Sequence, residues 1–160
     1  MITVSDNDSA NTLVGMLGNG NDAAGQEAVN TYCKNNGYTD TSMGRMLLEK
    51  ASANENYTSA RDCSVFLKNI YENKLEHSED MLNLLKQQTR TEKIPKGVPA
   101  GVETANKTGE LDHVENDAAI VFDGENPYII CVMADNLSDT TEARQRIVDI
   151  SSVVYENISK

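Results

Sequence analysis

Apolar residues recur at helical spacing in the first part of the chain, and glycines divide the pattern into two segments. Residues 8–17 alternate small and apolar side chains and stop at Gly18-Asn19-Gly20, a strong helix breaker. Asp22 is expected to cap a second helix that runs to about Asn35, because the Asn36-Gly37 pair that follows has ready access to positive φ. The pattern therefore predicts two helices, followed by a polar connection.

Two further helices are predicted before residue 92. Ser59, with Asp62 three residues later, resembles a helix-start box. The helix that follows has one apolar face, which consists of Cys63, Phe66, Leu67 and Ile70. Ser78 is expected to cap the next helix, and the side chains predicted to point inward from it are Met81, Leu82, Leu84 and Leu85.

The period changes from helical to extended after a loop with prolines and glycines at residues 94–101. Residues 102–108, 118–122 and 128–133 predict three strands, and a hairpin-sized loop joins the last two. Asp139, with Glu142 three residues later, is expected to cap a final helix. The apolar stripe predicted for this helix consists of Ile147, Ile150, Val153 and Val154.

The order of elements predicts an α+β fold, with helices first, then an antiparallel β-meander and a closing helix. We expect one domain over residues 1–160, with a helical subdomain to about residue 92 and the sheet and last helix from residue 93. A three-strand sheet has two edges, and an unpaired edge invites another strand. A homodimer formed through an exposed sheet edge is therefore one hypothesis for this chain.

Composition and charge narrow the classes of partner. The chain has 160 residues, of which 39% are hydrophobic and 24% charged, as in an ordinary globular domain. With 14 basic and 25 acidic residues its net charge is −11, which argues against nucleic acid or an anionic membrane surface as partner. No apolar run could span a bilayer, and the first residues are not a signal peptide, so any targeting information is expected upstream.

The cysteines and histidines predict neither a disulfide framework nor a metal centre. Cys33, Cys63 and Cys131 lack metal-like spacing, and each lies in an apolar segment, which favours buried free thiols. His77 and His113 have no partner at ligand spacing, so both are expected to be exposed. We predict no metal and no cofactor.

Two short motifs about a hundred residues apart carry the candidate chemistry. Ser5-Asp6-Asn7 lies near the start, and Lys107-Thr108-Gly109 lies late in the chain. The two occur together in class A β-lactamases and penicillin-binding proteins, where a Ser-x-x-K supplies the nucleophile. This chain contains no Ser-x-x-K. Further matches are Lys93-Ile94-Pro95 and Asn116-Asp117-Ala118, and with them the chain resembles the C-terminal two-thirds of a class A β-lactamase-like serine hydrolase.

The resemblance implies a partial β-lactamase/transpeptidase-like fold and a role for each residue of the first motif. Ser5 would carry the proton to the leaving nitrogen. Asn7 would position the missing lysine and the substrate amide, and Asp6 would hold the loop. Taken alone, Ser-Asp-Asn is also a common turn and helix-cap composition.

The second motif would bind the substrate. By the same resemblance, Lys107 would hold Ser5 electrostatically and attract the substrate carboxylate, to which Thr108 would donate. Gly109 would permit close approach of the substrate, and the backbone N–H of Glu110 would be one oxyanion donor. Taken alone, Lys-Thr-Gly is usually a strand end followed by a turn.

One feature departs from the family pattern. Class A β-lactamases carry a glutamate that activates the water for deacylation. Here Arg45 is followed by apolar residues, and Glu49 reaches the corresponding place only by a shifted alignment; the alternative for Glu49 is a solvated surface carboxylate. The sequence leaves open whether the parent protein hydrolyses β-lactams or acts by slow acylation or as a peptidase.

Two hypotheses about function follow. In the first, the chain is the C-terminal portion of a serine hydrolase that acts on a β-lactam or a cell-wall peptide, is inactive without its N-terminal segment, and works outside the cytoplasmic membrane, as the family does. In the second, it is a non-catalytic domain that binds peptidoglycan or peptide. A Ser-x-x-K upstream of Met1 would favour the first.

Overall fold

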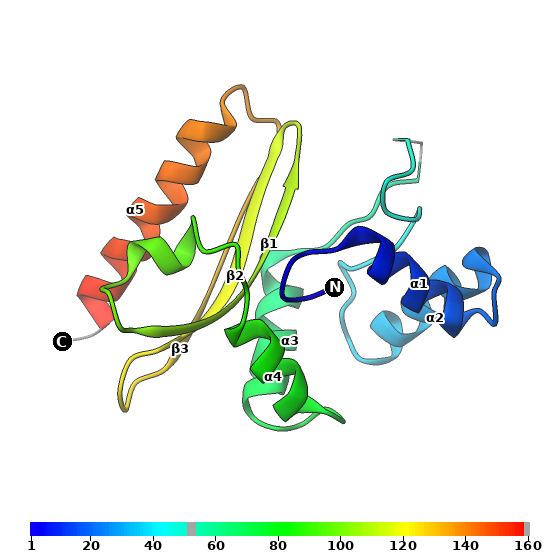
Figure 1. Ribbon diagram of the computed structural model, residues 1–160, viewed down its shortest axis with the longest axis horizontal. Coiled ribbons are helices and arrows are strands. Elements are labelled where there is room, and N and C mark those ends of the chain that lie inside the picture. Colours follow the sequence, from blue (N-terminus) through cyan, green and yellow to red (C-terminus); the bar gives the residue numbers. More distant parts are fainter. Residues whose placement is uncertain (51–53, 159–160) are drawn as a thin grey trace. The chain divides into compact units, whose positions relative to one another are not determined.

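The computed structural model describes residues 1–50 and 54–158. The α+β class predicted from the sequence is confirmed, with helices, a three-strand antiparallel sheet and a closing helix in that order (Figure 1). Contacts divide the chain into two units. The first comprises Met1 and Ser5–Asp62, and the second comprises Ile2–Val4 and the chain from Cys63 onward. The expected division near residue 92 is therefore not where the contacts divide the chain, and each unit is described by itself.

The first unit is built on the helices α1 (Asn7–Leu17) and α2 (Asp22–Asn35), which pack against each other. Both helices were predicted at these positions. The cap of α2 differs from the prediction, because the side chain of Asn21 accepts the N–H of Ala24 at 3.0 Å and Asp22 is the first helical residue. At Gly25 a Cβ would lie 2.0 Å from the carbonyl oxygen of Val14, so the close approach of α1 to α2 requires glycine there.

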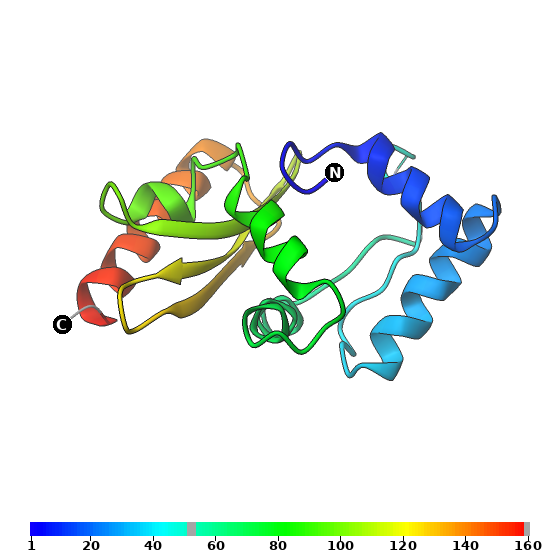
Figure 2. The same cartoon turned by 60° about the horizontal axis from the view of Figure 1, so that its bottom comes forward.

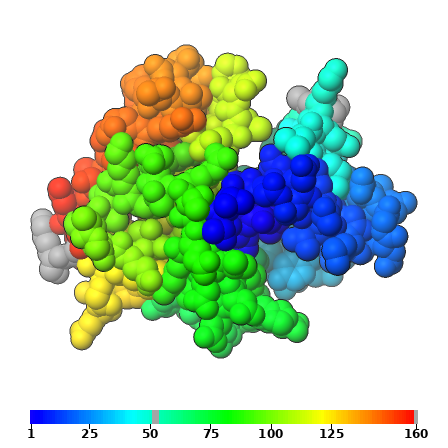
Figure 3. Space-filling model, viewed as in Figure 1, coloured from blue at the N-terminus to red at the C-terminus, as the bar shows by residue number. Residues whose placement is uncertain are grey.

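The second unit contains the sheet, whose strand order is β1-β2-β3. The strands β1 (Glu103–Leu111), β2 (Val114–Phe122) and β3 (Tyr128–Ala134) are antiparallel neighbours. β1 and β2 extend beyond the predicted segments and meet at a tight turn. The loop of residues 123–127 between β2 and β3 projects from the unit and is yellow in Figure 3.

Two apolar cores lie on opposite faces of this sheet. The first is built with the helices α3 (Ala60–Tyr71) and α4 (Ser78–Lys86), and the second with α5 (Thr140–Ile158) and the short 3-10 helix η1 (Ile94–Gly97) (Figure 2). The buried members of the first are Leu67, Ile70, Leu85, Ala105, Ala118 and Ile120, and those of the second are Ile94, Ala119, Val121, Ile130 and Ile147. β2 is the middle strand and is therefore buried on both faces.

Two details of α4 differ from the prediction. Ser78 does not cap the helix, because its hydroxyl donates to the carbonyl of Leu75 at 2.7 Å and accepts the N–H of Leu75. His77 occupies the cap position in a left-handed conformation, without a side-chain capping bond. Leu84 is exposed, while Leu85 is buried. The cap prediction failed because a serine near a helix start can also close the preceding turn.

The apolar stripe of α5 also differs from the prediction. Ile147 is buried as expected, but Ile150 and Val153 are 44% and 58% exposed. The buried face follows a spacing of four residues, through Ala143, Ile147 and Ser151. The hydroxyl of Ser151 donates to the carbonyl of Ile94 at 2.9 Å, so a polar residue fills the place where η1 meets the helix.

The cysteines and histidines are the residues for which the sequence predicts free thiols and exposed rings. Cys33, Cys63 and Cys131 are free thiols; Cys33 is buried and the other two are partly buried. His77 and His113 are exposed as expected, and Nδ1 of His113 lies 2.9 Å from the carbonyl oxygen of Leu137. Among residues 1–50 and 54–158, no cluster of three or more His, Cys, Asp or Glu side chains could hold a metal ion. Within the same residues, no helix is both long and apolar enough for a membrane span.

Candidate active site

The first motif forms the start of α1, in the first unit. Ser5 has φ +58°, and Asp6 is the N-cap residue, whose carboxylate accepts the N–H of Ser9 at 2.7 Å. Asn7 is the first residue of the helix. The left-handed turn at Ser5 followed by an extended Asp6 fixes how the chain enters the helix, because Asp6 satisfies one of the unpaired N–H groups there.

The charge of Asp6 is held by this capping interaction. Hydrogen bonds from the side chain and the backbone of Ser9 lower the pKa of Asp6 below its ordinary value. The carboxylate is therefore ionised at neutral pH, and it lies at the positive end of the helix dipole. The capping role assigned to Ser-Asp-Asn compositions in general thus applies to Asp6 in this chain.

One helical turn after Asn7, the side chain of Asn11 fixes a loop from the same unit. Its Nδ2 donates to the carbonyl of Leu47 at 2.8 Å, and its Oδ1 accepts the N–H of Leu47 at 2.9 Å. Both backbone groups of one residue are thus held by one amide, which ties the loop after Arg45 to the motif helix. This anchor was not recognised in the sequence, because asparagine in a helix ordinarily has no predictable distant partner.

The loop itself is organised by Arg45 and Glu49. Arg45 Nε lies 2.8 Å from Glu55 Oε2, and Arg45 Nη1 donates to the carbonyl of Glu49 at 2.9 Å. The carboxylate of Glu49 accepts the N–H of Met46 at 3.0 Å. Glu49 is therefore exposed and turned back onto its own loop, and its proposed part in deacylation stays a prediction.

The second motif lies on β1, in the second unit. The strand alternation sends Lys107 and Gly109 to the face that carries α3 and α4, and Thr108 and Glu110 to the face that carries α5. Nζ of Lys107 donates to the carbonyl of Thr108 at 2.7 Å. Burial lowers the pKa of Lys107, and Arg90 lowers it further, while Asp117 and Glu110 act in the opposite direction.

Gly109 is not required by the packing of its own strand. A Cβ there would lie 3.6 Å from two atoms of Asn116, which is an ordinary contact, and the backbone φ is not in the left-handed region. Neither strain nor crowding among the described residues therefore accounts for glycine at this position. A need for open space beside the strand would account for it.

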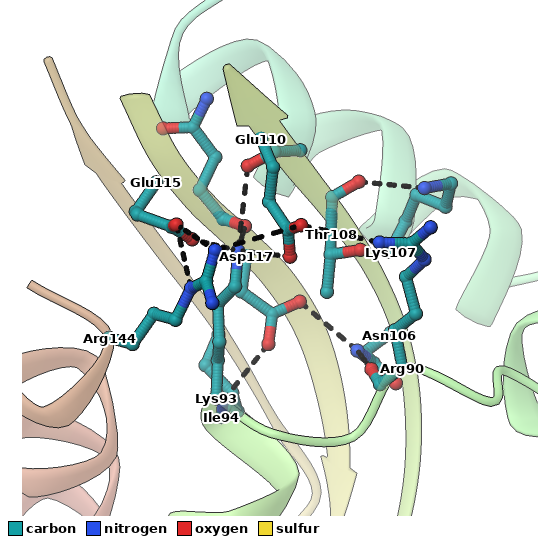
Figure 4. A network of polar contacts seen from close by, with 12 residues as sticks. Arg90, Lys93, Ile94, Asn106, Lys107, Thr108, Glu110, Glu115, Asp117 and Arg144 are labelled. Atoms are coloured by element: carbon teal, nitrogen blue, oxygen red, sulfur yellow. Dashed lines mark hydrogen bonds and ion pairs between the residues drawn. The ribbon is translucent and has the colours of Figure 1, made fainter. Parts of the chain in front are cut away.

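A buried ionic network lies behind the second motif, on the α5 face of the sheet (Figure 4). Lys93, which is 1% exposed, places Nζ 2.7 Å from Glu115 Oε2 and 3.2 Å from Glu110 Oε1. It also donates to the carbonyl of Asn116 at 2.9 Å. Arg144 on α5 approaches Glu115 Oε1 at 2.7 Å through both Nε and Nη2. These cations join both strands at the end of β1 that carries the motif.

The network offsets a repulsion that the strand register creates. Glu110 and Glu115 lie directly opposite each other on the antiparallel pair, and like charges in such a pair are destabilising. Burial raises the pKa of Glu115, but hydrogen bonds from Arg144 and Lys93 outweigh it, so the net pKa lies below the ordinary value. Glu115 is therefore charged, and Lys93 holds the strand end in register.

Asp117 is the second buried carboxylate of this face. It is 1% exposed, and it accepts the N–H of Ile94 at 2.9 Å and the Nδ2 of Asn106 at 3.1 Å. Burial raises the pKa of Asp117 to about 6, although these hydrogen bonds and the charge of Lys93 lower it. Asp117 thus joins η1 to β1 and β2, directly opposite Thr108 of the motif.

The structure therefore places the predicted site residues in two groups. Lys107, Thr108, Gly109 and Glu110 lie together on β1 of the second unit. Ser5, Asp6 and Asn7 lie together at the start of α1 in the first unit, to which the loop with Glu49 also belongs.

Comparisons with known proteins bear on what these groups are. A family model described as the Beta-lactamase enzyme family matches residues 1–158. Among solved structures, PBP-A is 26% identical with a TM-score of 0.85, over 98% of this chain and 58% of PBP-A. A β-lactamase from Sphaerobacter thermophilus is 26% identical with a TM-score of 0.85, over 98% of this chain and 60% of the β-lactamase. A mutant of PBP-A, solved as an acyl-enzyme complex with penicillin G, is 25% identical with a TM-score of 0.84, over 98% of this chain and 58% of the mutant.

No match was found among the curated proteins. The chain spans 58 to 60% of the length of the solved structures described above. The family model, in contrast, covers nearly the whole chain, and both motifs lie within the matched residues. The chain therefore belongs to the Beta-lactamase enzyme family and forms part of a β-lactamase-like domain.

Proposed function

We propose that this chain is the C-terminal portion of a serine hydrolase that transfers an acyl group from a β-lactam or a peptide amide. It supplies the proton-shuttle residue Ser5 and the substrate-binding strand from Lys107 to Glu110. The nucleophile comes from a Ser-x-x-K segment of the parent protein. The observation that carries the proposal is the occurrence of both motifs, each at the start or within a regular element, inside a match to the Beta-lactamase enzyme family.

The chemistry divides between the two motifs. The serine hydroxyl of the Ser-x-x-K segment adds to the carbonyl carbon, the C–N bond breaks, and the proton passes through Ser5 to the leaving nitrogen. Lys107 and Thr108 hold the substrate carboxylate, and the N–H of Glu110 donates to the oxygen on which negative charge develops. Burial and the charge of Arg90 lower the pKa of Lys107, while Asp117 and Glu110 act in the opposite direction.

Gly109 supports the same assignment. Neither its backbone angles nor its contacts require glycine, and an open strand surface is what an extended peptide or its β-lactam mimic needs for β-augmentation. β1 is at one end of the strand order, so its outer edge has no strand partner among the described residues. Substrate therefore adds along β1, with its carboxylate toward Lys107.

The chain on its own is expected to be inactive. The nucleophile and its lysine act as a unit with the rest of such a site, and losing one member removes nearly the whole rate enhancement. The parent protein works outside the cytoplasmic membrane, where cell-wall peptides and β-lactams are found. This location is proposed by analogy with the family.

The free edge of β3 supports a proposal about assembly. Its residues, Tyr128–Ala134, carry no charge, no proline and no glycine, and such an edge pairs readily with another strand. In the absence of the N-terminal segment, two copies of this chain pair through β3 as a homodimer. Light scattering after size exclusion tests this, and a monomer at every protein concentration would contradict it.

An alternative function is a binding domain that holds a peptide or glycan along β1 without reacting with it. The same open strand edge favours it, because β-augmentation needs no nucleophile. The discriminating observation is the sequence upstream of Met1. A Ser-x-x-K there favours the enzyme, and its absence favours the binding domain.

The experiment is intact-mass spectrometry after incubation with penicillin G. The 160-residue chain is compared with a version extended upstream through any Ser-x-x-K. A mass increase on the extended chain alone supports the acyl-transfer enzyme, and its loss in the Lys107→Ala variant would assign the substrate-binding role to β1. No increase on either chain, with both folded by circular dichroism, would contradict the enzyme and favour the binding domain.

A further inference from the structure

The hairpin that joins β1 to β2 determines where the backbone groups of the second motif point. Leu111 pairs with Val114 across a two-residue turn, and residues that flank such a turn form a hydrogen-bonded pair. Hydrogen-bonded and non-hydrogen-bonded pairs alternate along an antiparallel ladder. Glu110 and Glu115 therefore form a non-hydrogen-bonded pair, and the backbone N–H of Glu110 points away from β2, toward the outer edge of β1.

The carbonyl at the other end of the same peptide group points the opposite way. The peptide bond between Gly109 and Glu110 is planar and trans, so its C=O is antiparallel to its N–H. The carbonyl of Gly109 therefore points toward β2, into the ladder. The carbonyl of Thr108, which by the same alternation is not used in the ladder, accepts the Nζ of Lys107 at 2.7 Å.

The buried ammonium of Lys93 lies at the carbonyl end of this peptide group. Its Nζ is 3.5 Å from the carbonyl oxygen of Gly109, and it donates at 2.9 Å to the carbonyl of Asn116, the ladder partner of Gly109. Its other contacts are the carboxylates of Glu110 and Glu115 (Figure 4). An ammonium has three N–H groups for these four acceptors, so its charge is the main attraction for the most distant one, the carbonyl of Gly109.

The two carboxylates do not use up the charge of Lys93, because each has a second cation. Glu115 Oε1 lies 2.7 Å from Nη2 of Arg144, and Glu110 Oε2 lies 3.2 Å from Nη1 of Arg90. Lys93 is also 1% exposed, and a buried charge is screened little by water and salt. Such a charge draws electron density toward the carbonyl oxygen, which makes the N–H of the same peptide group a stronger donor.

We propose that Lys93 is a positioning residue of the oxyanion site, whose ammonium orients and polarises the peptide group that carries the N–H of Glu110. That N–H is the oxyanion donor in the proposed function, on which this inference rests. Removing an oxyanion donor lowers the rate by about 10²- to 10³-fold, and polarisation strengthens a hydrogen bond by about 10–30%. The ammonium should therefore contribute about 2- to 8-fold to the rate of acylation.

The test compares two substitutions that break the same ion pair. Lys93→Met removes the cation beside the carbonyl of Gly109, whereas Glu115→Gln leaves that cation in place. Lys93→Arg keeps a positive charge at the position. The chain extended through its Ser-x-x-K is mixed with penicillin G, and the dependence of the acylation rate on penicillin concentration separates the limiting rate from the Kd.

Lys93→Met should lower the limiting acylation rate about 2- to 8-fold with little change in the Kd. Glu115→Gln should not lower it, and Lys93→Arg should recover most of the loss. The infrared band of the acyl-enzyme carbonyl should move to higher wavenumber in Lys93→Met and not in Glu115→Gln, because a weaker donor leaves more double-bond character in the C=O. Equal losses in Lys93→Met and Glu115→Gln would show a merely structural ion pair and would overturn the inference.

A second variant covers the case in which Lys93→Met does not fold. Removing one partner of a buried ion pair is strongly destabilising, whereas replacing both partners is tolerated better. The double variant Lys93→Met/Glu115→Gln then takes the place of the single one. It should acylate more slowly than Glu115→Gln alone, and equal rates in these two would overturn the inference.

Amide hydrogen exchange provides a measurement on the 160-residue chain that needs no nucleophile. Polarisation makes an N–H more acidic, so base-catalysed exchange at Glu110 should become slower in Lys93→Met, whereas loss of stability alone would make it faster. Unchanged or faster exchange would overturn the inference. An adduct that never forms on the wild-type extended chain would instead overturn the proposed function, and exchange would then decide alone whether Lys93 polarises this peptide group.

Discussion

At the scale of single residues, the second unit carries two buried carboxylates on its middle strand. Glu115 and Asp117 lie on β2, the most buried strand. Glu115 pairs with Lys93 and Arg144. Asp117 accepts hydrogen bonds from Asn106 and from the backbone of Ile94. The pKa of Glu115 is lowered because it faces two cations, whereas that of Asp117 is raised because it is buried and faces mainly neutral donors. Charge alone therefore does not predict how such a group affects stability.

Asp117 should make the protein less stable as the pH rises from about 4 to 6. Its pKa in the folded state is about 6 against an ordinary value of 3.8, so the folded state binds the proton more tightly than the unfolded state. Its favourable contribution is complete below pH 3.8 and is lost as the pH rises through 6, by roughly 3 kcal/mol.

The measurement is urea unfolding of the wild-type chain and of Asp117→Asn at several pH values from 4 to 7. The difference in unfolding free energy between the two should change in favour of the variant as the pH rises. Using the difference removes the titration of the other carboxylates. A difference that stays constant over this range would show that Asp117 has an ordinary pKa.

Several of these residues were identified in the sequence as family matches, but their contacts were not predicted. Lys93-Ile94-Pro95 and Asn116-Asp117-Ala118 were noted as family matches, but β2 was predicted to begin at residue 118. Glu115 and Asp117 were thus placed outside the strand, and their alternation with apolar residues was not used. The carboxylate partners of Lys93, Glu110 and Glu115, lie 17 and 22 residues further along the chain, and such contacts are not fixed by local pattern.

At the scale of elements, the helix and strand order was predictable because each segment carries its own period and its own breakers. α2 was predicted from residue 22 to about residue 35 and is found at Asp22–Asn35. The errors lie at caps and in the choice of buried face. α5 shows why, since apolar residues occupy more than one face of this helix, and packing against η1 selects a face that includes Ser151.

Two isoleucines of α5 provide a matched test of this face. Ile147→Ala should lower the free energy of unfolding by about 2 to 5 kcal/mol, because it removes a side chain that is 1% exposed. Ile150→Ala, at a side chain that is 44% exposed, should change it by less than about 1 kcal/mol. Chemical denaturation of both variants measures this, and similar losses in the two would contradict the register of α5.

At the scale of the whole molecule, family membership was predictable from two motifs and their order, and the division into units was not. The motifs are short strings whose meaning depends on occurring together, and the family match over residues 1–158 confirms that prediction. The boundary at Asp62 and Cys63 lies within α3, where no proline, glycine or composition change marks it. Long-range packing of α3 and α4 on the sheet sets it, and the local sequence does not encode that packing.

Two of the free thiols, one in each unit, can report how often each unit opens. Burial raises the pKa of Cys33 in the first unit and raises that of Cys131 in the second to about 12. At pH 8 a thiol with a pKa of 12 is ionised in about one molecule in 10⁴, so an alkylating reagent is expected to react mainly when the surroundings open. Mass mapping of the alkylated cysteines over time would then measure the rate of alkylation separately in each unit. Each rate is divided by the rate of the same cysteine in the urea-unfolded chain, which removes the intrinsic reactivity of the thiol. Equal ratios at Cys33 and Cys131 would mean that the two units open equally often, and unequal ratios would rank them by how often each one opens.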